Sequence, residues 1–238
     1  MSKQPFISVK DLSVGYNSRS GATIEVLRNV SLDINRGESI GLVGESGSGK
    51  STLALAAMGY FKRGLQALSG SAHFDEIDVL ALGRDELQKI RGGRLALIPQ
   101  NSGQSLTPTM RIGQQINEAL RLHSKVGASQ FQSRVIELLA QVRLPDPTVL
   151  ITRYPHELSG GQQQRAAIAM ALAGEPDALL LDEPTTGLDV TTQAHILELL
   201  RELAQARNMA MLYVSHDLGA ISRVCDRVAV MYAGEIVL

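Results

Sequence analysis

One short segment limits the fold of this chain more than any other. Residues 44–51 read GESGSGKS and match the pattern G-x-x-x-x-G-K-[ST]. Glycines let such a loop curl so that main-chain N–H groups face a phosphate, and a following helix adds the positive end of its dipole. The apolar run ESIGLVG precedes the loop, and KSTLALAAMGY follows it. The sequence therefore predicts a strand, a phosphate-binding loop and a helix closed by Gly59.

The side chains of this loop have separate roles in the chemistry that the pattern predicts. Lys50 can neutralise the β- and γ-phosphates of ATP, and the Ser51 hydroxyl can ligate Mg²⁺. The alternative interpretation is a plain turn rich in glycine and serine, which the flanking strand and helix argue against. The residues that we expect to bind nucleotide are Gly44, Glu45, Ser46, Gly47, Ser48, Gly49, Lys50, Ser51 and Thr52.

Two adjacent carboxylates follow an apolar run later in the chain. ALLLDEP places Asp182 and Glu183 at the C-terminal end of a strand that reads as buried on both faces. Ligands of open α/β sheets bind beyond these strand ends. We expect Asp182 to hold the Mg²⁺ shell and Glu183 to orient and deprotonate the attacking water. The alternative is an acidic turn that caps the next helix with the help of Pro184.

Apolar patterning elsewhere predicts an α/β fold with a mostly parallel sheet. FISVKDLSVGY and IEVLRNVSLDI alternate apolar and polar residues, which is typical of half-buried strands in an antiparallel N-terminal region. MAMLYV and RVAVMY read as further buried strands, and a helix before them carries Ile196, Leu199, Leu200 and Leu203 on one face.

The middle of the chain has a helical pattern. Between about residues 104 and 174 we expect a helical subdomain inserted into the α/β core of a single domain, residues 1–238. Val135, Leu138, Leu139 and Val142 form one apolar stripe in this segment. Two prolines, at positions 145 and 147, are expected to end that helix.

Bulk composition excludes some function classes. The net charge of -1 gives no global basic field for nucleic acid, and we expect no nucleic-acid partner. The only cysteine, Cys225, cannot form an internal disulfide, which fits a reducing compartment. The longest apolar runs are much shorter than a membrane span, so any work at a membrane requires a partner that holds the protein there.

A second glycine turn, LSGGQ at residues 158–162, completes a recognisable set of motifs about twenty residues before LLLDEP. With the first loop and the carboxylates, it makes the whole chain resemble the ATPase subunits of ABC transporters. The resemblance implies a P-loop NTPase fold and a head-to-tail dimer. Each ATP then lies between one chain's GESGSGKST and the other chain's signature, Leu158, Ser159, Gly160, Gly161 and Gln162. A plain helix N-terminus capped by Ser159 is the alternative interpretation.

The same resemblance implies roles for four further positions. His216 corresponds to the histidine that contacts the γ-phosphate and water, and Tyr16 to the aromatic that stacks on adenine. Gln100 corresponds to the glutamine that senses Mg²⁺ and couples to the membrane subunits, so the implied metal ligands are Ser51, Gln100 and Asp182. Asp189 matches the loop that links the two sites across the dimer. Each of these residues read alone would be an ordinary turn or packing residue.

Longer phrases resemble the branch that serves oligopeptide, dipeptide, nickel and related importers, among them YPHELSGG and DEPTTGLDVTTQAHIL. Two departures affect this assignment. NSGQSLTP stands where the branch usually has Asp-Pro and then Ser-Leu-Asn-Pro, in a segment that faces the membrane partner. The chain also stops at GEIVL, where the branch typically continues with a C-terminal extension. A truncated chain, a fragment of a fused protein and a short family member are the three explanations.

The resulting hypothesis is an ATPase that binds and hydrolyses ATP to drive solute import through two separate permease subunits. It is peripheral to the cytoplasmic face of the cell membrane, and an extracytoplasmic solute-binding protein is an expected partner. The second ATPase chain is either identical or different. Alternatives are a soluble ABC ATPase that moves no solute, the ATPase of an exporter, and a regulatory subunit. The presence of Glu183 and His216 argues against an inactive site.

Overall fold

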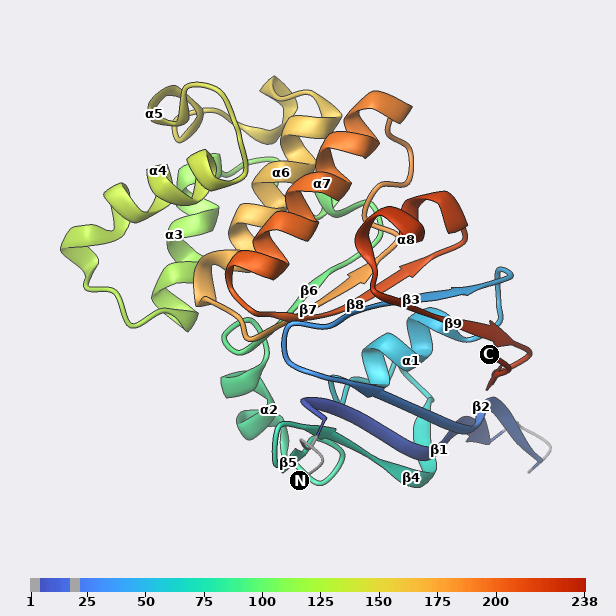
Figure 1. Cartoon of the computed structure of the whole chain (residues 1–238). Helices are drawn as coiled ribbons and strands as arrows, with labels where there is room; N and C mark the ends of the chain where they lie inside the picture. The colour runs from blue at the N-terminus through green and yellow to red at the C-terminus, as the bar shows by residue number, and fades with distance from the viewer. Residues whose placement is uncertain (1–4, 18–21) are drawn as a thin grey trace. The chain divides into compact units, whose positions relative to one another are not determined.

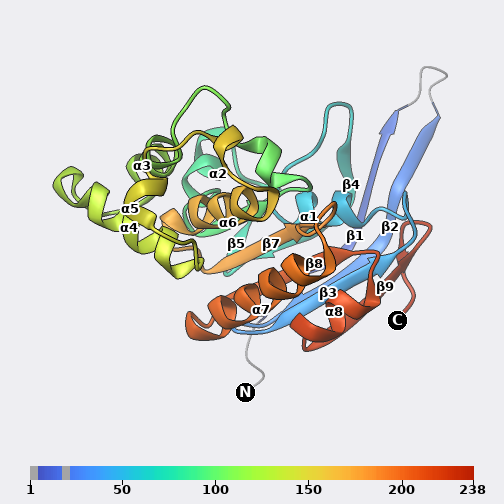
Figure 2. The same cartoon turned by 90° about the horizontal axis from the view of Figure 1, so that it is seen from above.

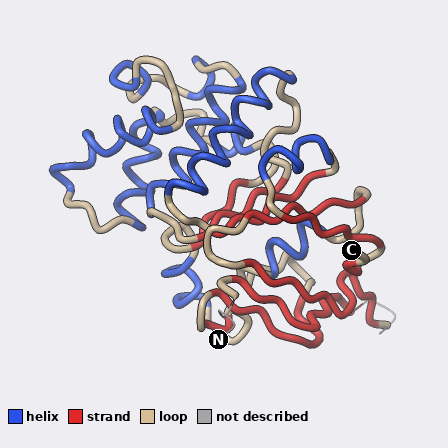
Figure 3. The backbone as a smooth tube through the Cα atoms, viewed as in Figure 1, coloured by secondary structure: helices blue, strands red, loops and turns tan. Residues whose placement is uncertain are grey.

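The computed structural model describes residues 5–17 and 22–238, which divide into two compact units. The described residues up to 87, together with residues 201–238, form unit 1, and residues 88–200 form unit 2. Figure 1 shows the elements of both units, and Figure 3 shows that strands dominate unit 1 whereas helices dominate unit 2. The boundary between the units falls inside two helices, α2 (Arg84–Ile90) and α7 (Val190–Ala206).

An antiparallel sheet forms the N-terminal part of unit 1, with the strand order β2-β1-β4-β5. Its strands are β1 (Ile7–Asn17), β2 (Thr23–Ile34), β4 (Gln66–Phe74) and β5 (Ile77–Asp78). Figure 2 shows β1 and β2 running side by side as a long antiparallel pair. Val9, Leu12 and Val14 of β1 are fully buried, and a shift in the pairing register between Val9 and Leu12 lets both face the core although they stand three residues apart.

The second group of strands in unit 1 has the order β10-β9-β3-β8. Its strands are β3 (Ser39–Gly44), β8 (Ala210–Ser215), β9 (Arg227–Tyr232) and β10 (Glu235–Ile236). The central strand β3 pairs in parallel with both β8 and β9. Two helices, α1 (Lys50–Ala56) and α8 (Leu218–Val224), pack on opposite faces of these strands (Figure 1). All five residues of β3 before its final glycine are buried, as expected for a strand covered on both faces.

Unit 2 combines a parallel strand pair with a helical region. Strands β6 (Leu95–Ile98) and β7 (Ala178–Asp182) pair in parallel. The principal helices are α3 (Ile112–His123), α4 (Phe131–Gln141), α5 (Pro147–Leu150) and α6 (Gly160–Ala171). Short 3-10 helices complete the unit at η1 (Ser102–Ser105), η2 (Ala128–Gln130), η3 (Pro155–Glu157) and η4 (Leu172–Gly174). Helices α3, α4 and α6 pack against one another (Figure 1).

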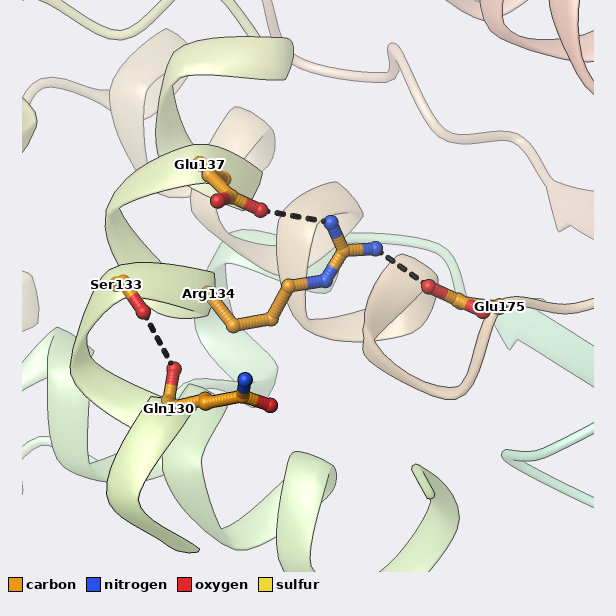
Figure 4. Close-up of polar contacts among 5 residues, drawn as sticks. All are labelled: Gln130, Ser133, Arg134, Glu137 and Glu175. Carbon is orange, nitrogen blue, oxygen red and sulfur yellow. Dashed lines mark hydrogen bonds and ion pairs between the residues drawn. The ribbon is translucent and has the colours of Figure 1, made fainter. Parts of the chain in front are cut away.

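Arg134 fastens α4 to the turn that leads into β7 (Figure 4). Its guanidinium donates to Glu175 at 2.7 Å and to Glu137, one turn along the same helix, at 3.0 Å. Only 17% of the arginine side chain is exposed. The bonds are therefore partly shielded from water, between α4 and the turn before β7, the strand that ends at Asp182.

The structure bears out the predicted fold class, with small corrections. The alternating segments form β1 and β2, and the predicted stripe of α4 and Val142 is buried at all four positions. The predicted helix that Gly59 closes is shorter than expected, because α1 ends at Ala56 and a turn takes the chain to Gly59, whose φ is +67°. The helix α4 ends at Gln141, before both prolines, and Pro147 instead starts α5.

No helix in the described ranges, residues 5–17 and 22–238, combines the length and apolar character needed to span a membrane.

Candidate functional site

The predicted phosphate loop connects β3 directly to α1 in unit 1. The chain turns through glycines 44, 47 and 49, whose φ angles are +159°, +82° and +105°. At Gly49 a Cβ would lie 2.8 Å from Leu27 Cδ2, so a larger residue would be both strained and crowded. The sequence thus produces the strand, loop and helix that the glycine pattern predicts.

Lys50 lies inside this loop rather than extending into water. The residue is 6% exposed, and its Nζ donates to the carbonyls of Gly44 at 2.8 Å and Glu45 at 2.7 Å. These bonds hold the ammonium group where the loop curls around it. A buried lysine of this kind supplies a fixed positive charge to an anion within the loop.

Ser48 offers the loop a further polar group. It is 5% exposed, and its hydroxyl oxygen has no hydrogen-bond partner within the described part of the chain. Burying a hydroxyl without a partner costs free energy, so such a group favours a polar ligand. The loop therefore fits a phosphate chemically, with an enclosed ammonium and an unsatisfied hydroxyl on the same short segment.

His216 reaches the same edge of unit 1 from another strand. It follows Ser215, the last residue of β8, which is the register partner of Val43 in β3. The main chain around it is fixed, because Asp217 N donates to Ser215 Oγ at 3.0 Å and the Asp217 carboxylate caps α8 through Gly219 N at 2.8 Å. His216 is thus an exposed histidine held at the end of the strand next to the phosphate loop.

Tyr16 stands near the end of β1, paired with Ile24 of β2, and is 38% exposed. Farther along β2, Leu27 lies next to Gly49 of the phosphate loop. The tyrosine therefore lies at the end of the antiparallel sheet that approaches the phosphate loop. Its predicted stacking on adenine stays a prediction.

Glu183 and Gln100 are brought together in unit 2. The strands that precede them pair in parallel with Ile98 opposite Leu181, so both residues emerge at the same strand ends. Gln100 Nε2 donates to Glu183 Oε2 at 3.2 Å. Thr186 Oγ1 donates to the same oxygen at 3.1 Å. Glu183 has a φ of +47°, which is uncommon for a residue with a side chain and often marks a functional position.

Asp182, the last residue of β7, is half-buried beside this pair. The Asp182 carboxylate, the Ser51 hydroxyl and the side-chain oxygen of Gln100 each offer an oxygen ligand, the type that Mg²⁺ prefers over nitrogen or sulfur. Asp182 and Gln100 lie at the strand ends of unit 2, and Ser51 lies in the first turn of α1 in unit 1. The chemistry of these residues fits a magnesium ion that accompanies a nucleotide.

The second glycine turn starts the helix α6 in unit 2. Ser159 is its N-cap, and the two reciprocal bonds of a capping box join Ser159 Oγ to Gln162 N at 3.4 Å and Gln162 Oε1 to Ser159 N at 3.0 Å. The alternative interpretation of Ser159 as a helix cap is therefore confirmed for the serine. The capping box does not engage the main-chain N–H groups of Gly160 and Gly161, which lie in the first turn of α6, where such groups can bind an anion.

Asp189 caps α7, which packs close to the glycine turn. Its Oδ1 accepts from Thr192 N at 2.9 Å, and hydrogen bonds from the side chain and main chain of Thr192 lower the pKa of the aspartate. A Cβ at Gly161 would lie 2.6 Å from Thr192 Cγ2. Thr192 thus contacts the signature turn and fixes the Asp189 loop, a role that the sequence analysis missed.

A groove in unit 2 lies next to the strand that leads to Gln100. Its volume is about 330 Å³. It is bordered by Pro99 at the end of β6, by one face of α3 and by Met170 of α6. Leu122 borders it with 74% of its surface exposed. The groove offers an apolar surface beside the predicted site.

The predicted residues therefore fall into two groups. Unit 1 holds the phosphate loop, Tyr16 and His216, and unit 2 holds Gln100, the two carboxylates, the signature turn and Asp189. Thr186 and Thr192 were not predicted, although each stands three residues after a predicted acid, Glu183 or Asp189. That spacing is the readable signal for a side chain that folds back onto a turn.

Comparisons with known proteins agree with this arrangement. Residues 27–186 match the family described as ABC transporter. The oligopeptide transport ATP-binding protein OppD of Lactococcus lactis subsp. cremoris is 42% identical over 237 residues, covering 100% of this chain and 70% of that protein. The dipeptide transport ATP-binding protein DppD of the same subspecies is 43% identical, covering 100% and 68%. A putative peptide import ATP-binding protein of Brucella melitensis is 44% identical, covering 97% and 69%.

Solved structures show the same fold. The ATP-binding cassette MJ0796, in a dimeric post-hydrolysis state bound to ADP and Pi, superposes with a TM-score of 0.85 at 30% identity, covering 98% of this chain and 97% of that one. The cbiO1 protein of Clostridium perfringens, described as part of an ABC transporter complex, gives a TM-score of 0.84 at 29% identity, covering 99% and 88%.

Proposed function

The chain belongs to the ABC transporter family, and we propose that it is the ATP-binding subunit that hydrolyses ATP to drive peptide import through separate membrane subunits. The observation that carries the peptide assignment is a match over 97–100% of this chain with proteins named for oligopeptide, dipeptide and peptide import, at 42%, 43% and 44% identity. These names favour import over export and over a soluble ATPase that moves no solute.

Nucleotide binding falls to unit 1 in this proposal. Lys50 holds the β- and γ-phosphates with the ammonium that its bonds to Gly44 and Glu45 already fix in place. Ser48 donates its hydroxyl to a phosphate oxygen, which satisfies the only polar side-chain atom of the described loop that is buried without a partner. Tyr16 stacks on the adenine from the end of β1.

Hydrolysis falls to Glu183, supported by its two hydrogen-bond donors. The carboxylate accepts a proton from the attacking water, and Gln100 and Thr186 hold Oε2 in a fixed direction. Ser51, Gln100 and Asp182 would hold Mg²⁺, which would neutralise negative charge on the nucleotide phosphates. His216 donates to the γ-phosphate from the end of β8. Fixed donors and a fixed base are what phosphoryl transfer needs, because its catalysis is mostly positioning and electrostatics.

A second ATPase chain completes each site. The capping box engages the N–H groups of Ser159 and Gln162, and we assign those of Gly160 and Gly161, in the first turn of α6, to the γ-phosphate on the partner chain. Asp189, fixed by Thr192, lies beside this turn and links one site to the other. ATP binding closes the dimer, and hydrolysis with phosphate release opens it.

Two permease subunits carry the peptide, with an extracytoplasmic solute-binding protein to deliver it. The apolar groove next to Gln100 provides a surface on which a permease can sense the state of the nucleotide site. The ATPase then works as a peripheral protein on the cytoplasmic face of the membrane. A second candidate solute, nickel, follows from the branch resemblance.

Uptake in cells that produce the protein tests this proposal. We expect Glu183→Gln in the natural gene to abolish uptake of a labelled mixture of di- to pentapeptides while uptake of radioactive Ni²⁺ is unchanged. Loss of nickel uptake with normal peptide uptake would show that the transported solute is nickel and not a peptide. Normal uptake of both, with ATP hydrolysis by the variant lost, would reject the transport function.

A further inference from the structure

Gln163 touches two segments that the predicted mechanism treats as separate parts. It lies in the first turn and a half of α6, just after the signature turn, and its side chain points back toward the start of that helix. Its Nε2 donates to Pro155 O at 2.9 Å and to Leu158 O at 3.1 Å. One amide group thus ties together both ends of the short segment that leads into the glycines.

The bonds of Gln163 add to other hydrogen bonds that hold the segment before the glycines. Leu158 N donates to Pro155 O at 3.0 Å, and Ser159 N donates to Gln162 Oε1 at 3.0 Å. Pro155 and Leu158, the residues at the two ends of this turn, are both buried. The direction of the glycine N–H groups therefore depends on a turn whose two ends are held by the side-chain amide of Gln163.

The other contact of Gln163 is with the segment that follows Gln100. In η1, Gly103 lies so close to α6 that a Cβ there would be 3.0 Å from Gln163 Cβ and 3.6 Å from Gln164 N. Any side chain at position 103 must push Gln163 or move η1. The glutamine is thus packed between η1 on one side and the carbonyls of the signature segment on the other.

We propose that Gln163 is a positioning residue that couples the segment after Gln100 to the signature turn. A shift of η1 presses on Gln163, which moves the Pro155 and Leu158 carbonyls and so redirects the N–H groups of Gly160 and Gly161. Within the proposed function, this contact lets the state of one chain's Gln100 adjust the contact with the ATP of the partner chain. That consequence rests on the proposed function, whereas the mechanical coupling does not.

Amide hydrogen exchange of the isolated chain tests the coupling without ATP or a partner. Gln163→Met keeps the length of the side chain and removes both donors. Gln163→Glu places a carboxylate against two carbonyl oxygens, and Gln163→Lys keeps a donor. We expect exchange at the amides of Glu157, Leu158 and Ser159 to be near that of the wild type in the lysine variant, roughly tenfold faster in the methionine variant and fastest in the glutamate variant.

The matched control is Gln132→Met on α4, where the same change affects an exposed glutamine of the same unit. Equal exchange in all three Gln163 variants and this control would overturn the positioning role.

The mild substitution Gly103→Ala tests the link to η1. We expect it to speed exchange at the same three amides, with no further increase when it is combined with Gln163→Met. Faster exchange confined to residues 101–106 would reject the coupling.

Activity provides a second, separate readout. If the signature turn serves the partner's ATP, kcat for ATP hydrolysis falls in the order lysine, methionine, glutamate while the Kd of each chain for ATP stays constant. The expected order of exchange rates with unchanged kcat would keep the coupling and reject the trans role of the signature. Unchanged exchange rates would reject the coupling, whatever the activity.

Discussion

Gln100 and Glu183 lie at the ends of two paired strands and are joined by a hydrogen bond of 3.2 Å from Nε2 to Oε2. Because Thr186 Oγ1 donates to the same oxygen at 3.1 Å, two side chains fix Oε2 of the Glu183 carboxylate. The pair therefore connects the predicted general base to the residue predicted to sense magnesium.

Thr186→Val tests the support given to Glu183 without touching a predicted magnesium ligand. The change removes the hydroxyl donor and keeps the shape of the side chain, so Glu183 gains freedom to rotate. We expect kcat to fall roughly 3- to 10-fold, which corresponds to about 1 kcal/mol, with unchanged ATP affinity. Phosphate release under saturating ATP measures kcat. Thr148→Val, at an exposed position of the same unit, is the control; equal rates for both variants would contradict the role.

Lys50→Ala tests the enclosed ammonium group. Removing the charge takes away a charge-assisted bond to phosphate, so we expect the Kd for ATP to rise roughly 10- to 100-fold. Titration calorimetry measures the Kd, and circular dichroism checks that the loop segment still folds after Gly44 and Glu45 lose their bonds to the lysine. Lys62→Ala is the control, because that lysine is exposed on the same unit. ATP affinity equal to that of the control would refute the assignment.

The sequence predicted the strands best where alternation or continuous apolar runs were long, as in β1, β2 and β7. It missed β4, because Gln66–Phe74 contains two serines and Gly70 and is held as a strand by its pairing with β1. Tertiary pairing overrides weak local propensity in such segments. The predicted site residues occur on the expected elements, but the support from Thr186, Thr192 and Gln163 depends on turns whose geometry only the structure gives.

Arg134→Met tests the tie between α4 and the turn before β7. The methionine keeps much of the aliphatic contact but loses the bonds to Glu137 and Glu175. Since the acidic partners are mostly exposed, we expect a loss of about 1 kcal/mol in the free energy of unfolding, measured with urea. Arg121→Met on α3 is an exposed control. A loss no larger than in the control would show that the pairs contribute nothing to stability.

Cys225 is expected to be unreactive in the folded protein. Burial, reinforced by the nearby charge of Asp226, raises the pKa of its thiol to about 12 from an ordinary value of 9.0. Below pH 9 the thiol is neutral in both states, so its contribution to stability is complete there, and it is lost as pH rises toward 12. Labelling with a maleimide at pH 8 should be much slower than at an introduced Gln132→Cys, and should become fast in urea. Equal native labelling rates would contradict the burial.

The central claim is that Glu183 is the base for ATP hydrolysis, and paired measurements on Glu183→Gln test it most directly. Calorimetry gives the affinity for ATP, and phosphate release gives kcat, with Glu198→Gln on α7 as a control that changes an exposed glutamate of the same unit. The account predicts that kcat falls roughly 10²- to 10⁴-fold while ATP affinity is retained. Full hydrolysis by the variant, or a loss of ATP binding that explains the loss of activity, would contradict it.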